Sequence, residues 1–187
     1  MADTIKFIGF SGSLRKLSFN TMLLNALPAL LPEGTILEKF SLADIPLYNG
    51  DLDIPDKEAR PAPVVAFRSA IQNADAMIIV SPEYNYSIPG VLKNALDWAS
   101  RGKDSPLLGK TVALMGVSNG MWGTTRMHMA IQPVFLTLGM RQVKPEIMVA
   151  MGKEKFDETG NLTDDTTKGL IRKQLLALQE AILKGKK

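Results

Sequence analysis

The sequence contains no cysteine. Disulfide frameworks, thiolate nucleophiles and cysteine-ligated metal sites are therefore excluded. No apolar run reaches the roughly 20 residues that span a bilayer as a helix. Residues 1–6 also lack the basic and then apolar layout of a signal peptide. We accordingly expect a cytoplasmic protein with no membrane partner.

A large surplus of one charge is also missing. The 187 residues carry 22 Lys and Arg against 19 Asp and Glu, a formal net charge of +3. Basic residues cluster only in the C-terminal tail, so the pattern gives no indication of a nucleic-acid partner. The small positive excess does suit an anionic ligand. With 45% hydrophobic residues the chain can bury one core, and we expect a single domain over residues 1–187.

Histidine occurs once, as His128. It falls on a predicted helix, and no serine or acidic residue is spaced to form a catalytic dyad with it. We expect His128 to lie at the surface or at a subunit interface.

Two kinds of apolar segment alternate along the chain. Short apolar runs predict strands, and apolar residues three or four positions apart predict helices. The strands are expected at residues 5–10, 35–40, 76–80, 111–117 and 146–150, and the helices at 20–30, 64–74, 90–100, 124–138 and 163–184. This alternation predicts an α/β fold, a parallel sheet with helices on both faces. Ligands of such sheets bind beyond the carboxyl ends of the strands.

The first loop at such an end, residues 11–20, joins a strand to the start of a helix. Amide groups at a helix N-terminus attract phosphate. Three neutral donors lie in this loop, Ser13, Ser18 and Asn20. Arg15 adds a planar guanidinium that binds phosphate through two hydrogen bonds. The structural alternative is a capped turn with a solvated arginine, but the loop holds more polar residues than a cap needs.

This loop matches neither of the usual nucleotide fingerprints. The spacing Gly-x-Gly-x-x-Gly is absent. The tripeptide Gly109-Lys110-Thr111 imitates only the end of a Walker A motif and precedes a strand, whereas that motif follows one. A single phosphate ester is therefore the expected ligand.

Two further loops, residues 81–90 and 118–123, follow the third and fourth predicted strands. The second loop is stiffened by two prolines and carries Tyr84 and Tyr86. Tyrosine rings and exposed backbone amides suit a flat heteroaromatic ring. A rigid turn with ordinary surface tyrosines is the alternative. In the third loop, the sequence fits two interpretations equally well. Trp122 lines a ligand site or a subunit interface, or the loop is a plain flexible turn.

Two of these loops resemble motifs of the NADPH-dependent FMN reductase family. The first motif runs Gly12-Ser13-Leu14-Arg15-Lys16 and continues with Ser18 and Asn20. The second begins Ser81-Pro82-Glu83-Tyr84-Asn85 and continues through Asp97-Trp98. The resemblance covers nearly the whole chain and is to the branch of bacterial quinone, chromate and azo-compound reductases. It implies a flavodoxin-like three-layer α/β sandwich, with a five-stranded parallel sheet in the order 2-1-3-4-5. It also implies bound FMN, NADPH or NADH as reductant, and a homodimer or homotetramer.

The resemblance also implies roles for individual residues. The positions that bind the FMN phosphate and ribityl chain correspond here to Ser11, Ser13, Arg15, Ser18, Phe19 and Asn20. The positions that line the isoalloxazine ring correspond to Pro82, Glu83, Tyr84 and Asn85. Ser118 would contact the ring from the third loop, where the match to the family is less close.

The implied activity is oxidation of NAD(P)H, with electrons passing through FMN to a small acceptor such as a quinone, an azo compound or chromate. No side chain is expected to be catalytic, because hydride transfer is the chemistry of the flavin. A flavodoxin-type electron carrier is the main alternative, although such carriers are usually strongly acidic. A signalling receiver domain would need acidic residues where this sequence has Phe10-Ser11 and Ser81.

Overall fold

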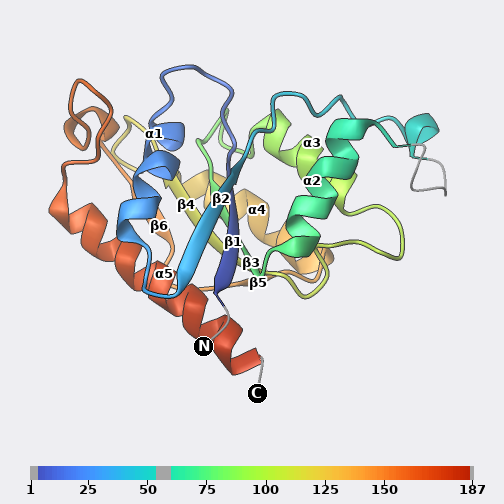
Figure 1. Cartoon of the computed structure of the whole chain (residues 1–187). Coiled ribbons are helices and arrows are strands. Elements are labelled where there is room, and N and C mark those ends of the chain that lie inside the picture. The colour runs from blue at the N-terminus through green and yellow to red at the C-terminus, as the bar shows by residue number, and fades with distance from the viewer. Residues whose placement is uncertain (1–3, 54–59, 186–187) are drawn as a thin grey trace.

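A parallel sheet forms the centre of the computed structural model, which describes residues 4–53 and 60–185. The strands are β1 (Ile5–Ser11), β2 (Thr35–Phe40), β3 (Ala76–Val80), β4 (Thr111–Val117), β5 (Arg141–Gln142) and β6 (Ile147–Val149). Their order is β2-β1-β3-β4-β5, with β6 also paired to β4 (Figure 1). The order predicted for the flavodoxin-like sheet is confirmed.

The outer edge of the sheet differs from the prediction of one strand at residues 146–150. β5 pairs with Thr111 and Val112, and β6 pairs with Met115 to Val117, so two short strands share the place beside β4. Pro145 lies between them and has no N–H for a ladder bond. The Nε2 group of Gln174 instead donates to the carbonyl of Leu114 at 3.1 Å. A side chain therefore replaces the missing strand at this point.

Helices cover both faces of the sheet, as the alternation of segments predicts (Figure 1). They are α1 (Phe19–Ala26), α2 (Ala62–Asn73), α3 (Gly90–Ala99), α4 (Thr125–Thr137) and α5 (Asp165–Gly185). α1 and α5 pack on one face, and α2, α3 and α4 pack on the other. The first helix is shorter than predicted, because a 3-10 turn containing Pro28 follows it at Leu27–Leu30.

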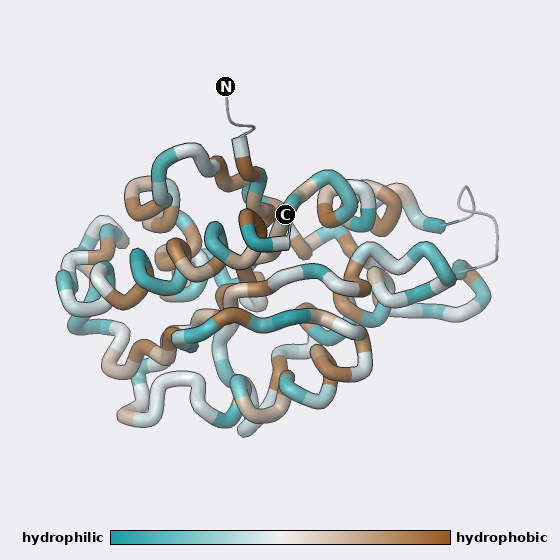
Figure 2. The backbone as a smooth tube through the Cα atoms, turned by 90° about the horizontal axis from the view of Figure 1, so that it is seen from below, coloured by the Kyte–Doolittle hydropathy of each residue, from teal (hydrophilic) through white to brown (hydrophobic). Residues whose placement is uncertain are grey.

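Each helix buries one side. Hydrophobic and hydrophilic residues alternate along the helical coils of Figure 2, as expected where one helix face packs on a sheet. All five residues of β3 are buried, which confirms that this strand is covered on both faces. Among the described residues, no helix has the length and apolar character needed to cross a membrane.

The expectation for His128 is wrong. Its side chain is 2% exposed, on the side of α4 that also buries Met127 and Ile131. Its ring Nδ1 lies 3.2 Å from Thr124 Oγ1 and 3.0 Å from the Thr124 carbonyl. Burial lowers the pKa of His128, so the neutral imidazole is favoured.

Candidate functional site

The first and second loops meet at the carboxyl edge of the sheet. Ser13 Oγ lies 3.3 Å from the hydroxyl of Tyr84, which is 71 residues away along the chain. Gly12 permits this approach, because a Cβ at Gly12 would lie 2.5 Å from Ser81 Oγ. The loop expected to bind a phosphate and the loop expected to bind a ring therefore lie in contact.

The first loop is organised by its own hydroxyl groups. Ser18 caps α1, since its Oγ accepts a hydrogen bond of 3.2 Å from the Asn20 amide. Ser11 Oγ accepts from the Ser13 amide at 3.2 Å and from Thr21 Oγ1 at 3.1 Å. The first amides of a helix have no intrahelical acceptor, so α1 presents donors and a partial positive charge to the loop.

Arg15 and Phe19 lie on the outer side of this loop. Arg15 is exposed, and its guanidinium carbon lies 6.0 Å from the centre of the Phe19 ring. Phe19 is fixed from behind by Phe156, with ring centres 5.5 Å apart. Arg15 is thus placed at the rim of the site on an aromatic support.

Asn20 is turned inward. It is 3% exposed, its Nδ2 donates to the Val117 carbonyl at 3.0 Å, and its Oδ1 accepts from the Val117 amide at 2.9 Å. The side chain joins α1 to the end of β4. It thereby holds the third loop, which begins at Ser118, beside the first.

The second loop is a tight hairpin turn. Tyr84 and Ser87 exchange two backbone hydrogen bonds, of 3.1 and 3.0 Å. Asn85 and Tyr86 both have positive φ, 47° and 67°. Left-handed backbone is uncommon for an aromatic residue, and such strain collects at functional sites. The turn leaves Tyr84 48% exposed and Tyr86 68% exposed.

Glu83 contacts the start of α4. Its Oε2 accepts hydrogen bonds from the amides of Arg126, at 2.8 Å, and Met127, at 3.2 Å. Its Oε1 lies 3.5 Å from the Arg126 guanidinium, which stacks 4.0 Å from the centre of the Tyr86 ring. The carboxylate is therefore neutralised by a helix N-terminus and an arginine. Arg126 has no signal in the sequence, because its partners lie about forty residues earlier.

The third loop closes on itself. Ser118 Oγ donates to the Gly123 carbonyl at 2.6 Å and accepts from the Gly120 amide at 3.2 Å. Met121 is 83% exposed and Trp122 is 69% exposed at its tip. The predicted polar residue is thus used to shape the loop, while the tip presents apolar side chains.

A fourth segment, between β6 and α5, completes the edge and was not predicted. The amide of Gly152 donates to the Ser118 carbonyl at 2.9 Å. A Cβ at Gly152 would lie 3.3 Å from the Phe19 ring. A lone glycine after a short strand carries no distinguishing pattern, so sequence reasoning had no signal for this contact.

Comparison with known proteins gives one consistent result. Residues 5–154 match the family described as NADPH-dependent FMN reductase. The chain belongs to this family. It is therefore an FMN-dependent NAD(P)H oxidoreductase, and the predicted enzyme class and cofactors are confirmed. The family comparison thus supports an enzyme and not an electron carrier that lacks a substrate of its own.

Relatives of this FMN reductase family cover the whole chain. The present chain is 42% identical over 180 residues to the NAD(P)H-dependent FMN reductase PA1204 of Pseudomonas aeruginosa, and the match covers 96% of each chain. It is 40% identical over 189 residues to a quinone reductase of Escherichia coli K12, across 100% of each. Among solved structures, the flavoenzyme NAD(P)H:(acceptor) oxidoreductase FerB of Paracoccus denitrificans superposes with a TM-score of 0.85 at 30% identity. That match covers 96% of this chain and 98% of FerB.

The donors at the edge fit the cofactor of the FMN reductase family. Serine hydroxyls, an exposed arginine and the α1 N-terminus suit a phosphate monoester. Glu83 is the acid of the second loop, and its charge is engaged by α4, so it does not oppose an anion. The exposed rings of Tyr84, Tyr86 and Trp122 provide the surface that a flat ring requires.

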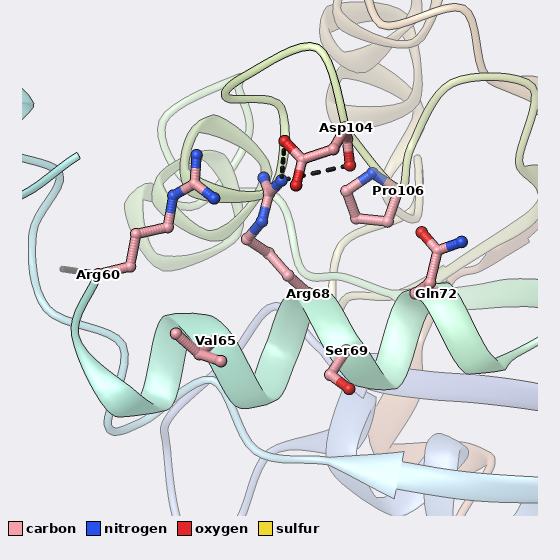
Figure 3. Close-up of a pocket in the computed structure, with 7 residues that line it drawn as sticks. All are labelled: Arg60, Val65, Arg68, Ser69, Gln72, Asp104 and Pro106. Carbon is pink, nitrogen blue, oxygen red and sulfur yellow. Dashed lines mark hydrogen bonds and ion pairs between the residues drawn. The ribbon is translucent and has the colours of Figure 1, made fainter. Parts of the chain in front are cut away.

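A separate cavity of about 410 Å³ lies along α2, away from these loops (Figure 3). Arg68 lines it, but this guanidinium already donates to backbone carbonyls at the end of α3 and beyond: Trp98, Ala99, Arg101 and Asp104. Arg60, on the same wall, pairs with Asp53 at 2.6 Å. The cavity lies between α2 and the segment that holds Asp104 and Pro106, and both arginines that line it already have protein partners.

Proposed function

We propose that this FMN reductase uses NAD(P)H to reduce quinones, and that the three loops form its FMN site. The observation that carries the proposal is the contact between Ser13 and Tyr84, which unites a phosphate-type loop and a ring-type loop. The E. coli relative, named a quinone reductase, supports the acceptor class, as does a potato relative named NAD(P)H:quinone oxidoreductase at 40% identity over 188 residues. Bound FMN supplies the redox chemistry.

The residues at the edge have two kinds of role in this proposal. One group faces the cofactor: Ser11, Ser13, Arg15, Ser18 and Phe19 toward its phosphate and chain, and Pro82, Tyr84 and Asn85 toward its ring. The other group positions the loops from behind: Asn20 through Val117, Glu83 through α4, and Ser118 through Gly123. A positioning role suits Asn20 and Glu83 because both polar side-chain atoms of each bind another element of the fold, and it suits Ser118 because its hydroxyl spans the third loop from Gly120 to Gly123.

The acceptor would approach from the open side of the hairpin turn. Tyr86 and Trp122 are exposed there, and a flat quinone gains contact with such rings through stacking. Arg126, which is paired with Glu83, stacks on Tyr86 and holds that ring in place. No side-chain acid or base is required of the chain in this scheme.

The remaining parts of the proposal concern the protein as a whole. We propose that residues 1–187 form one domain, that the enzyme acts in the cytoplasm, and that it assembles as a homodimer or homotetramer. The exposed apolar residues Met129 and Leu136 on α4 are compatible with burial in such an assembly. Light scattering of the purified protein measures the assembly directly.

An acceptor panel tests the function. FMN-loaded protein is given NADPH or NADH together with a benzoquinone, an azo dye, chromate or no acceptor. We expect sustained oxidation that is fastest with the quinone and absent from protein freed of FMN. An electron carrier would show no sustained oxidation without a partner reductase. Turnover of an azo dye or chromate well above that of every quinone would contradict the acceptor class.

A further inference from the structure

A second cavity adjoins the first loop, on the flank of α1 that faces the end of β2. Its volume is about 260 Å³, and it lies between α1 and the end of β2. The polar residues that line it are Ser11, Ser13, Thr21, Asn25, Lys39 and Ser41. Of the described residues that line this cavity, none is acidic and one, Lys39, is charged.

Lys39 is well placed to meet an anion. It is exposed at the end of β2, and its ammonium donates to the neutral Asn25 Oδ1 at 2.9 Å. That contact orients the ammonium, and no carboxylate in the described part of the chain pairs with it. Thr21 Oγ1 and Ser11 Oγ, 3.1 Å apart, form part of the opposite wall. A cation facing hydroxyl groups suits a phosphate monoester.

This cavity is distinct from the flank of α1 that faces β4. Asn20 points to Val117 on β4, whereas Thr21 and Asn25 point to Ser11 and Lys39 near β2. The two sets lie on different sides of one helix, because successive residues are about 100° apart around its axis. Ser13 lines the cavity and also contacts Tyr84, so the two places are linked by one residue.

We propose that the cavity around Lys39 receives the 2′-phosphate of NADPH and so makes the enzyme favour NADPH over NADH. This inference rests on the proposed function, since it names the reductant of that same site. The 2′-phosphate is the group by which the two reductants differ, and it carries close to two negative charges at neutral pH. The Lys39 ammonium and the Ser41 hydroxyl supply its donors, since Ser41 Oγ only accepts a hydrogen bond, from the Ala43 amide.

The variant Lys39→Gln tests the proposal, with Lys173→Gln as a matched control on the exposed side of α5. Binding of 2′,5′-ADP and of 5′-ADP to the FMN-loaded proteins is measured by calorimetry. We expect wild type and Lys173→Gln to prefer 2′,5′-ADP, and Lys39→Gln to lose that preference. In turnover, KM for NADPH should rise by about three- to tenfold in Lys39→Gln, while KM for NADH stays within about twofold.

Three results would overturn the inference. Equal binding of 2′,5′-ADP and 5′-ADP to the wild-type protein would mean that the cavity does not bind the 2′-phosphate. An equal rise in KM for NADH and NADPH would assign Lys39 a general role. If Lys39→Gln weakened FMN binding as much as it weakened 2′,5′-ADP binding, with FMN binding measured by flavin fluorescence, the cavity would be assigned to the FMN phosphate instead. Absence of turnover with either reductant would refute the proposed function, and the calorimetry would still decide the nucleotide site.

Discussion

Glu83 Oε2 accepts a hydrogen bond of 2.8 Å from the backbone N–H of Arg126, a residue 43 positions later. The bond fastens the hairpin turn of the second loop to the N-terminus of α4. A carboxylate at a helix N-terminus is favourable because the first amides there lack partners. The shape of the second loop therefore depends on a residue whose charge is directed to the start of α4.

The Glu83 bond is tested by Glu83→Ala. We expect the free energy of unfolding to fall by roughly 0.5–2 kcal/mol, as for loss of a helix cap. FMN affinity should fall as well, because the turn at Tyr84 loses its support. Glu83→Gln keeps an acceptor and should lose less, and Glu158→Ala, on an exposed loop, should change neither quantity. Weakened FMN binding with no change in urea unfolding would mean that Glu83 acts by contact alone.

Arg15 is expected to bind the FMN phosphate directly. Arg15→Ala should weaken FMN binding by roughly 1.5–3 kcal/mol, the range for a lost charge-assisted hydrogen bond. Fluorescence titration of FMN measures this change. Lys16→Ala removes the same charge from the neighbouring exposed position and should have a smaller effect. Unchanged affinity in Arg15→Ala would remove this residue from the phosphate site.

Asn20 is expected to stabilise the protein without its cofactor. Asn20→Ala leaves the buried amide and carbonyl of Val117 without their partner, at a cost of roughly 1–3 kcal/mol for each unpaired group. Urea unfolding of FMN-free protein measures the loss. Asn73→Ala, at an exposed position in the last turn of α2, is the control. If Asn20 served only as a ligand for FMN, its FMN-free variant would be as stable as wild type.

His128 should make stability depend on pH. Burial lowers its pKa from the ordinary value of 6.5, so the folded protein takes up this proton at a lower pH than the unfolded chain. The contribution of neutral His128 to the free energy of unfolding is fully present above pH 6.5. It is lost as the pH falls toward the pKa of His128 in the folded protein. The slope reaches at most about 1.4 kcal/mol per pH unit.

Urea unfolding between about pH 7.5 and pH 5.5 measures that slope. His128→Gln should flatten it, even if the variant is less stable overall. The sequence has a single histidine, so no second imidazole contributes. Identical slopes for wild type and variant would contradict the assignment.

Local signals explain which parts of the fold were predictable. The buried run of β3 and the alternation of strands and helices follow from short segments of sequence, and the strand order follows from the resemblance to the FMN reductase family. The side on which His128 lies was not predictable, because both flanks of α4 carry apolar residues. The division of the last strand also escaped prediction, since it depends on Gln174 reaching Leu114 from a distant helix.

The candidate site shows the same limit. The loops that hold Ser13 and Tyr84 were expected to converge, because carboxyl ends of parallel strands share one edge. The sequence did not reveal that Asn20 and Glu83 bind the protein itself, because those partners depend on tertiary packing. The types of residue in the loops were enough to single them out in the sequence. Only the structure shows that Asn20 and Glu83 bind other parts of the protein.

The central claim is that electrons pass from NAD(P)H through bound FMN to a quinone. The most direct measurement is an anaerobic titration of FMN-loaded protein, followed by its visible flavin absorbance. We expect one equivalent of NADPH to bleach the absorbance and one equivalent of benzoquinone to restore it. Flavin that NADPH and NADH both fail to bleach, or that the quinone fails to restore, would contradict the account.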